Sequence, residues 1–160
     1  MSGKRRVSRL TFRPLAALSL AMSTTFPLAA DKAELEEGSR LMPKFGADGL
    51  VTCVTTSATT GEVLMLAHMN ADALAKSVET GIAHYWSRSR QELWRKGDTS
   101  GQVQTIREMR IDCDQDAIWI KVDVGGDGNS CHTGRRSCFY RTVSLGATDP
   151  DKTALRIDED

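Results

Sequence analysis

The sequence Asp112-Cys113-Asp114-Gln115-Asp116 separates two segments, 103–111 and 117–124, that have the composition of β-strands. If these five residues are extended like their neighbours, their side chains alternate between two faces. Asp112, Asp114 and Asp116 then share one face, and Cys113 points to the other. Three carboxylates on one face repel one another unless a cation lies among them, and oxygen ligands suit a hard ion such as Mg²⁺. The stretch therefore predicts a magnesium site with a thiol on the opposite side of the backbone.

The segments around this stretch predict a sheet. In residues 117–124, β-branched side chains alternate with polar or amphipathic ones, as in a half-buried strand. Further strands are expected at 50–56, 62–68, 82–86 and 138–144. Helices are expected at 32–37, after the N-cap residue Asp31, and from Asn70 to Gly81. The predicted fold class is α+β, with a mostly antiparallel β-sheet and one or two helices.

Length and charge restrict the kind of protein. The 160 residues suffice for one domain with a hydrophobic core. The 21 basic and 21 acidic residues give a formal net charge of zero, so no bulk charge favours nucleic acid or a membrane surface as a partner. We expect four regions: a doubtful extension over 1–21, a helical segment over 22–45, the main domain over 46–146 and a flexible acidic tail over 147–160.

The N-terminal extension admits two interpretations. Basic residues precede the apolar stretch 15–22, and Ala29 and Ala30 resemble the end of a cleavage site, so the segment has the outline of a secretory signal. The apolar stretch is short, however, and polar residues interrupt it before that site. We favour the alternative that translation begins at Met22. The segment is too short to span a membrane.

The four cysteines, Cys53, Cys113, Cys131 and Cys138, admit two disulfides or a metal site. Acidic, basic and glycine neighbours favour metal binding by the last three. Cys53 lies in an apolar strand and is interpreted as a small buried residue. Thiolates of Cys113, Cys131 and Cys138 would hold zinc and leave a position for water, as in catalytic sites. His132 would then transfer a proton, or would itself be the fourth ligand.

Residues 85–101 interleave aromatic side chains with basic ones. Rings and cations of this kind can stack a nucleobase and bind phosphate, and the glycines and hydroxyls that follow can surround a phosphate. The alternative is that the tryptophans are core residues and the basic side chains a solvated face. Beside a metal site, we interpret the segment as nucleotide-binding. The candidate substrate-binding residues are Trp86, Arg88, Arg90, Trp94, Lys96, Thr99, Ser100 and Gly101.

Three blocks of sequence, 94–101, 112–116 and 131–140, resemble the phosphoribosyl-AMP cyclohydrolase family of histidine biosynthesis. The resemblance extends over residues 46–143. It implies opening of the adenine ring of 1-(5-phosphoribosyl)-AMP between N1 and C6 by zinc-bound hydroxide. It also implies an intertwined homodimer with one zinc per subunit, in which Cys113 joins Cys131 and Cys138 of the partner. The three aspartates match the family's magnesium ligands.

Other functions account for parts of the pattern. An EF-hand would need glycine and glutamate where Ala117 and Asp123 stand, and a solvated acidic turn is the simpler alternative. A zinc deaminase would need a Pro-Cys-x-x-Cys signature, whereas Cys131 and Cys138 are seven residues apart. A zinc-stapled RNA-binding module would need a closed four-cysteine site. The resemblance instead implies a cytoplasmic enzyme with a single activity, because the chain ends soon after the last block.

Overall fold

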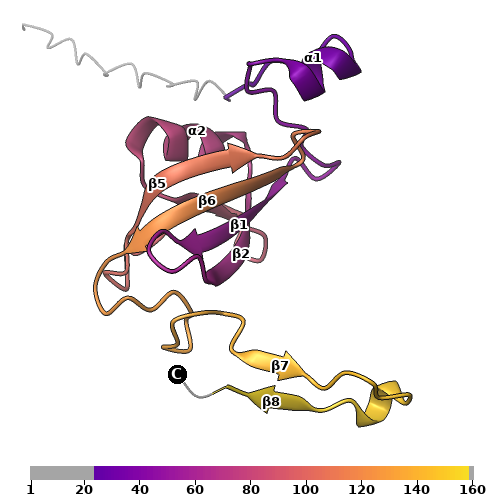
Figure 1. The fold of residues 1–160 in the computed structure, drawn as a ribbon. Helices are drawn as coiled ribbons and strands as arrows, with labels where there is room; N and C mark the ends of the chain where they lie inside the picture. Colours follow the sequence, from indigo (N-terminus) through magenta and orange to yellow (C-terminus); the bar gives the residue numbers. More distant parts are fainter. Residues whose placement is uncertain (1–23, 159–160) are drawn as a thin grey trace, which may run out of the picture.

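The computed structural model describes residues 24–158, and its largest element is a four-stranded sheet (Figure 1). The strands are β1 (Val51–Ser57), β2 (Val63–Met69), β5 (Gln104–Ile111) and β6 (Ala117–Val124), in the order β2-β1-β6-β5. β1 pairs antiparallel with β2, and β5 with β6, whereas β1 and β6 run parallel at the centre. The predicted α+β class with mostly antiparallel pairing is confirmed, and the central parallel pair was not foreseen.

Both predicted helices are present. α1 (Lys32–Glu37) begins after Asp31, whose carboxylate accepts a hydrogen bond from the Glu34 backbone N–H at 2.8 Å. α2 (Ala71–Thr80) begins after Asn70, whose side chain accepts from the Ala73 N–H at 2.9 Å, and it ends at Gly81 in the left-handed conformation. These caps satisfy backbone groups that a helix leaves unpaired at its ends, which is why both helices lie where predicted.

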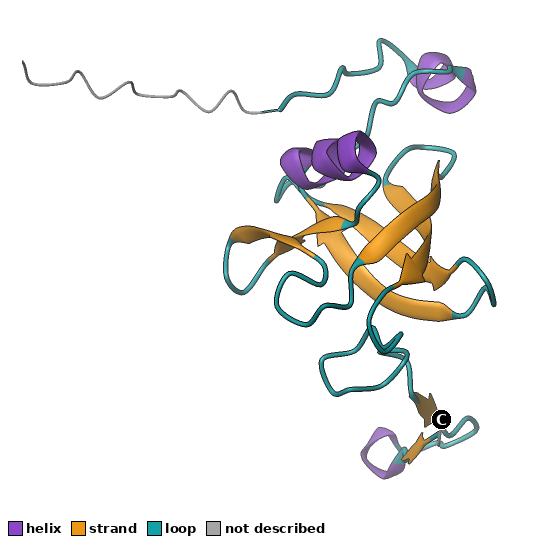
Figure 2. Ribbon diagram, turned by 90° about the vertical axis from the view of Figure 1, so that its left-hand side faces the viewer, coloured by secondary structure: helices purple, strands orange, loops and turns teal. Residues whose placement is uncertain are grey.

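A second, smaller sheet stands beside the first (Figure 2). It consists of β3 (His84–Ser87) and the antiparallel β4 (Glu92–Arg95). β4 was not predicted, because its four residues lie inside the basic and aromatic segment and show no clear alternation. The Tyr85 and Trp94 rings face each other across this hairpin, with centroids 5.2 Å apart.

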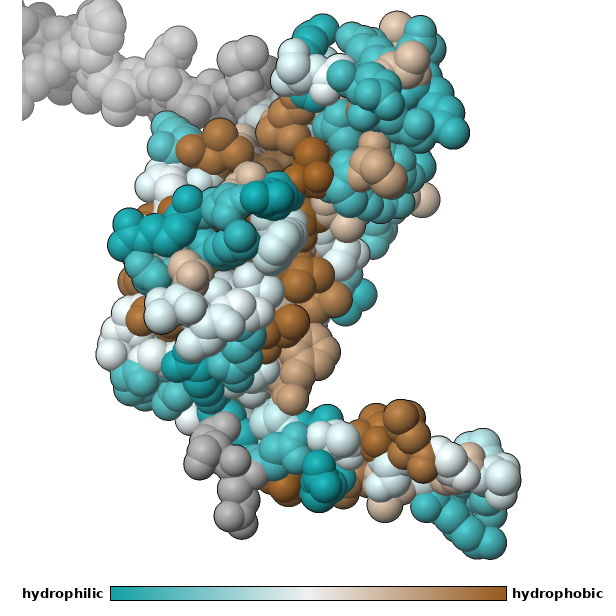
Figure 3. All heavy atoms as spheres, in the orientation of Figure 1, coloured by the Kyte–Doolittle hydropathy of each residue, from teal (hydrophilic) through white to brown (hydrophobic). Residues whose placement is uncertain are grey.

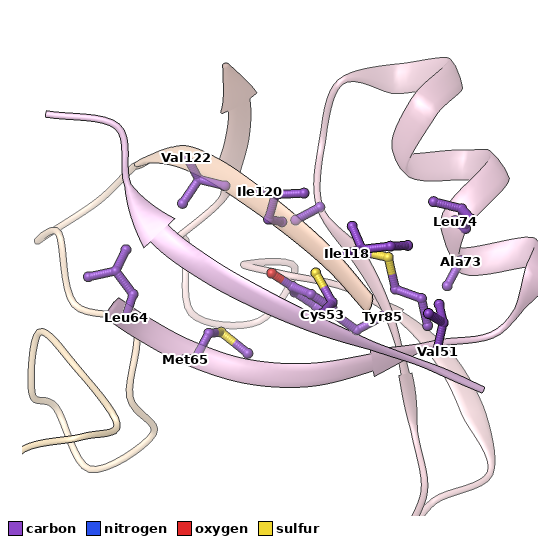
Figure 4. Close-up of a cluster of buried hydrophobic side chains, with 12 residues drawn as sticks. Val51, Cys53, Leu64, Met65, Ala73, Leu74, Tyr85, Ile118, Ile120 and Val122 are labelled. Carbon is purple, nitrogen blue, oxygen red and sulfur yellow. The ribbon is translucent and has the colours of Figure 1, made fainter. Parts of the chain in front are cut away.

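The hydrophobic core lies between the large sheet and α2 (Figure 4). Cys53 is fully buried there, which confirms its interpretation as a small apolar residue. Burial also raises the pKa of its thiol to about 12. Most core residues come from β1, β2, β6 and α2; Tyr85 comes from β3, and Ala83 immediately precedes that strand. The full set is Val51, Cys53, Leu64, Met65, Met69, Ala73, Leu74, Ala83, Tyr85, Ile118, Ile120 and Val122.

Residues 112–116 are not extended, so that prediction is wrong. They form the turn that joins β5 to β6. The Asp112 carboxylate accepts hydrogen bonds from the backbone N–H groups of Asp116 and Ala117, both at 3.0 Å. Gln115 adopts a left-handed φ of 58°. Aspartate side chains bond readily to nearby backbone N–H groups, and here that local bonding replaces the alternation of a strand.

The C-terminal residues form an arm that leaves the main body (Figure 1, Figure 2). β7 (Arg141–Val143) pairs antiparallel with β8 (Leu155–Ile157), and the 3-10 helix η1 (Pro150–Lys152) lies between them. The last predicted strand, 138–144, is therefore shorter than expected. The segment 147–160, expected to be a flexible tail, contains η1 and β8. No helix between residues 24 and 158 has the length and hydrophobicity of a membrane span.

Candidate active site

A cleft of about 1060 Å³ opens beside the β3–β4 hairpin, with walls from β2, β3, β4, the loop that follows β4, and His132. Two predicted substrate-binding residues, Arg88 and Gly101, do not line it. The others do: Trp86, Arg90, Trp94, Lys96, Thr99 and Ser100. Aromatic, cationic and hydroxyl groups thus converge in one concave surface with a histidine, which suits a phosphorylated aromatic ligand.

Trp94 lines the cleft, is partly buried and packs against the hydrophobic core. The Arg90 guanidinium lies 5.9 Å and the Lys96 ammonium 5.8 Å from its ring centroid, distances at which cations attract an aromatic face. Tyr85 also packs against the Trp94 ring. The alternative prediction, that the tryptophans are core residues, therefore holds in part for Trp94. Its indole therefore organises the two cations at the wall of the cleft.

Cys131 and Cys138 lie together at the edge of the cleft. Cys131 is buried, and its sulfur accepts a hydrogen bond from the Thr133 hydroxyl at 3.0 Å. Burial would raise the pKa of the Cys131 thiol, but hydrogen bonds from Thr133 and Cys138 and the charge of Arg135 outweigh it and lower that pKa. Burial and the neighbouring Cys131 raise the pKa of Cys138 to about 11. One thiol of the pair thus ionises before the other.

The loop that carries this thiol pair is tied to the body at both ends. The Lys96 ammonium donates a hydrogen bond to the Ser130 carbonyl oxygen at 2.9 Å, and the Cys138 N–H donates to the Leu64 carbonyl oxygen at 2.8 Å. Burial lowers the pKa of Lys96, and the nearby Cys138 and Cys131 oppose that shift. Lys96 therefore anchors the loop and places positive charge beside the sulfurs.

A buried polar network lies behind the same loop. The Tyr85 hydroxyl donates to Gln104 Oε1 at 2.7 Å, so its bond of 2.9 Å with the Thr55 hydroxyl must be donated by Thr55. Gln104 Nε2 in turn donates to Ser130 Oγ at 3.4 Å and lies 3.5 Å from Met65 Sδ. Sulfur in a thioether only accepts, which supports this orientation of the amide. Gln104 is fully buried, and the residue pattern gave no sign of its role.

The three aspartates of the β5–β6 turn come together despite the wrong backbone prediction. Oxygens of Asp112, Asp114 and Asp116 lie within 4.8 Å of one another. The charge of Asp114, with smaller contributions from burial and Asp112, raises the pKa of Asp116. The Lys44 ammonium lies 3.2 Å from Asp114 Oδ2. Such a set of mutually repelling oxygen donors fits a hard divalent cation.

Cys113 does not lie with the other two predicted zinc ligands in one chain. It is in the turn before β6, whereas Cys131 and Cys138 follow that strand, and eight residues of strand span about 26 Å. Between residues 24 and 158, the aspartates are the only three candidate ligands that one chain brings together. All four cysteines are free, so no disulfide forms, and within residues 24–158 one chain brings no three cysteines together. The Cys131–Cys138 pair supplies two soft ligands and needs more from elsewhere.

His68 and His84 also line the cleft and were not predicted as site residues. His84 Nδ1 lies 2.8 Å from the Ile82 carbonyl oxygen, which favours a proton on that nitrogen and leaves Nε2 without one in the neutral ring. Burial, followed by the charge of Arg88, lowers the pKa of His68. Both residues sit in predicted strands, where a histidine alone gives no signal of a site.

The region of the chain that carries the cleft, the thiol pair and the aspartate turn matches a known protein family. Residues 65–140 match the family model described as phosphoribosyl-AMP cyclohydrolase. A phosphoribosyl-AMP cyclohydrolase of Agrobacterium fabrum (strain C58 / ATCC 33970) is 61% identical over 129 residues, which are 80% of this chain and 86% of that protein. This chain belongs to the phosphoribosyl-AMP cyclohydrolase family. A member from Sinorhizobium fredii (strain NBRC 101917 / NGR234) is 62% identical over 125 residues, 78% of this chain and 82% of the relative.

A third family member, from Brucella abortus (strain S19), is 57% identical over 131 residues, 82% of this chain and 92% of the relative. The region matched by the cyclohydrolase model contains Cys113, Cys131 and Cys138 as well as the aspartate turn. It also contains every residue that lines the cleft. α1 and the β7–β8 arm lie outside it.

Proposed function

We propose that this cyclohydrolase family member opens the adenine ring of 1-(5-phosphoribosyl)-AMP in histidine biosynthesis. Water is added across the N1–C6 bond: its oxygen bonds to C6, and N1 receives a proton as the bond breaks. The single observation that carries the proposal is the cleft itself. Its aromatic and cationic walls end at His132 and Lys96, immediately beside the Cys131–Cys138 pair.

The residues of the cleft divide between binding and proton transfer. Trp86 would stack on the base, and Arg90, Thr99 and Ser100 would bind the phosphates, with Arg88 and Gly101 joining them when the substrate is bound. His132 lines the cleft, with Nδ1 4.0 Å from Cys131 Sγ. We assign it the proton transfer, because its ring stands between the thiol pair and the cleft.

Two metal sites fit the donor atoms of the chain. Cys131 and Cys138 would hold Zn²⁺ together with Cys113 of a second subunit, and bound zinc lowers the pKa of water to about 7. The separation of Cys113 from the other two thiols along β6 supports this division between subunits. Asp112, Asp114 and Asp116 would hold Mg²⁺, which is commonly shared between carboxylates and substrate phosphates.

The same ligand set supports a homodimer with one zinc per subunit, because three thiols are completed only by two chains. We also propose a cytoplasmic location, since the thiols must stay reduced to bind metal and cytosolic reductants keep them so. The net charge of zero gives no reason to expect a nucleic acid or membrane partner.

Ring opening by the purified protein tests the proposal. The protein loaded with Zn²⁺ and Mg²⁺ is mixed with 1-(5-phosphoribosyl)-AMP, and the product is followed by its ultraviolet spectrum and by a mass increase of one water. We expect turnover that a zinc chelator abolishes. Cys131→Ser should lose zinc and turnover together, whereas the matched Cys53→Ala variant should retain both. Absence of ring opening by the metal-loaded wild type would overturn the proposal.

A further inference from the structure

The β7–β8 arm has one apolar face and one polar face. Residues paired across antiparallel strands share a face, so the pairs Val143–Leu155 and Arg141–Ile157 lie together. Val143, Leu155 and Ile157 are 49%, 54% and 56% exposed. The other face carries Thr142 and Arg156, both bonded to Asp158. Figure 3 shows hydrophobic surface on the arm where it stands away from the body.

The arm has little to stabilise it within its own chain. A lone two-stranded hairpin is marginally stable in water at best. In the described part of the chain, its backbone hydrogen bonds close within the arm, as from Asp158 N–H to the Tyr140 carbonyl and from Ser144 N–H to the Ala154 carbonyl. A covered apolar face would supply the missing stability.

The position of the arm indicates what covers it. It begins at Arg141, three residues after Cys138, so its base adjoins the thiol pair. If zinc is shared as in the proposed function, on which this step rests, the turn that carries Cys113 of a second copy must lie beside Cys138. The arm then extends along the body of that second copy.

The surface next to that turn is the N-terminal segment, residues 24–45. Gln115 in the turn binds it directly: its side chain accepts from the Met42 N–H at 2.7 Å and donates to the Leu35 carbonyl at 2.9 Å and the Arg40 carbonyl at 3.3 Å. This segment exposes Leu28, which is 88% accessible. The segment is therefore bonded to the turn that the arm would meet, and it carries one exposed apolar side chain.

Charge favours the same arrangement. The turn before β6 and α1 are acidic on balance: Asp112, Asp114, Asp116, Glu34, Glu36 and Glu37 outnumber Lys44, Arg40 and Lys32, which pair with three of them. The region after β6 and at the base of the arm carries Arg135, Arg136 and Arg141, of which Arg136 pairs with Glu62 of its own chain. Opposite ends of one chain are thus complementary, and a two-fold axis between two copies satisfies both contacts at once.

We propose that the β7–β8 arm is a dimer clasp, which lays Val143, Leu155 and Ile157 on the N-terminal segment (24–45) of a second copy of this chain. Two clasps, one from each subunit, hold the turn that carries Cys113 against the thiol pair of the partner. The arm thereby stabilises the dimer, and none of its residues lines the cleft of its own chain.

Matched substitutions on the two faces of the arm test the clasp. Val143→Lys/Leu155→Lys places charge on the apolar face, and Thr142→Lys/Arg156→Lys places lysines on the polar face, near Asp158. Sedimentation of the zinc-loaded, full-length proteins over a concentration series measures the dimer dissociation constant. We expect the first variant to raise this constant about 100-fold relative to wild type, and the second to leave it within a few-fold.

A second measurement locates the contact. A photoreactive benzoylphenylalanine replaces Leu155, and isotopically labelled and unlabelled copies are mixed before illumination. Crosslinks from position 155 to residues 24–45 of the other copy support the clasp, and crosslinks confined to the same chain overturn it.

The clasp and the proposed function can fail separately. Equal dimer affinity of the wild type and the Val143→Lys/Leu155→Lys variant would overturn the clasp and leave the shared zinc site standing. A wild type that binds zinc fully and turns over as a monomer would overturn the shared site, and with it the clasp.

Discussion

The Lys96 ammonium donates a hydrogen bond of 2.9 Å to the Ser130 carbonyl oxygen, one residue before Cys131. Lys96 is only 8% exposed, so this bond is made in the interior and shielded from water. It joins the wall of the cleft to the loop that carries both thiols. This side chain therefore links the wall of the cleft to the loop that carries the proposed zinc ligands.

Replacement of Lys96 by methionine should weaken zinc binding while the fold is retained. Methionine keeps the length and apolar stem of the side chain but removes the charge and the hydrogen bond to Ser130. Loss of a group that orients metal ligands typically lowers metal affinity or activity by about 10- to 100-fold. Competition with a chromophoric chelator measures the affinity, with the surface variant Lys121→Met as control. Unchanged zinc affinity in Lys96→Met would show that the loop holds its position without this bond.

Tyr85 and Gln104 should act as a unit in stability. Gln104→Leu leaves the Tyr85 hydroxyl without its acceptor, and an unsatisfied buried polar group costs about 1–3 kcal/mol. Tyr85→Phe alone removes one donor and leaves Gln104 Oε1 unpaired. In the double variant the second change costs less than it does alone, because the partner is already absent. Denaturant unfolding of the two single variants and the double variant measures this coupling, and strictly additive losses would exclude it.

Local patterns predicted the elements of this fold, whereas long-range contacts decided how they meet. Asp31 and Asn70 determine where α1 and α2 begin through bonds three residues away, and such signals are visible in a sequence. The parallel pairing of β1 with β6 joins residues more than sixty positions apart, and no local pattern encodes it.

The residues of the candidate site likewise divide into those that a local sequence pattern indicated and those that it did not. Cysteines and aspartates at short spacing indicated metal ligands, and interleaved rings and cations indicated the cleft. Gln104 and Gln115 gave no such signal, because a glutamine has the same polar identity on a surface as in a buried network. The turn at 112–116 was misassigned because side-chain bonds from Asp112 to the backbone compete with the alternation of a strand.

Gln115 should control the attachment of the N-terminal segment to the aspartate turn. Gln115→Ala removes its side-chain bonds to Leu35, Arg40 and Met42, each worth about 0.5–1.5 kcal/mol net. We expect faster amide hydrogen exchange in residues 35–44 and little change in the core strand β1. Asn129→Ala, in the loop that follows β6, provides the comparison. Equal exchange in both variants would mean that other contacts hold the segment.

Asp114→Asn should spare zinc and raise the magnesium requirement for turnover. The substitution removes one of three clustered negative charges, so the attraction for a divalent cation falls, while the thiols after β6 are untouched. It also weakens the ion pair with Lys44. That pair is exposed and screened by solvent, so the unfolding free energy should change little. Asp123→Asn, which breaks an exposed pair with Arg107 away from the turn, is the matched control. The dependence of turnover on Mg²⁺ concentration is then measured for both variants. Identical curves would show that the turn does not bind the metal, because a cation held by these oxygens binds more weakly when one of their charges is lost.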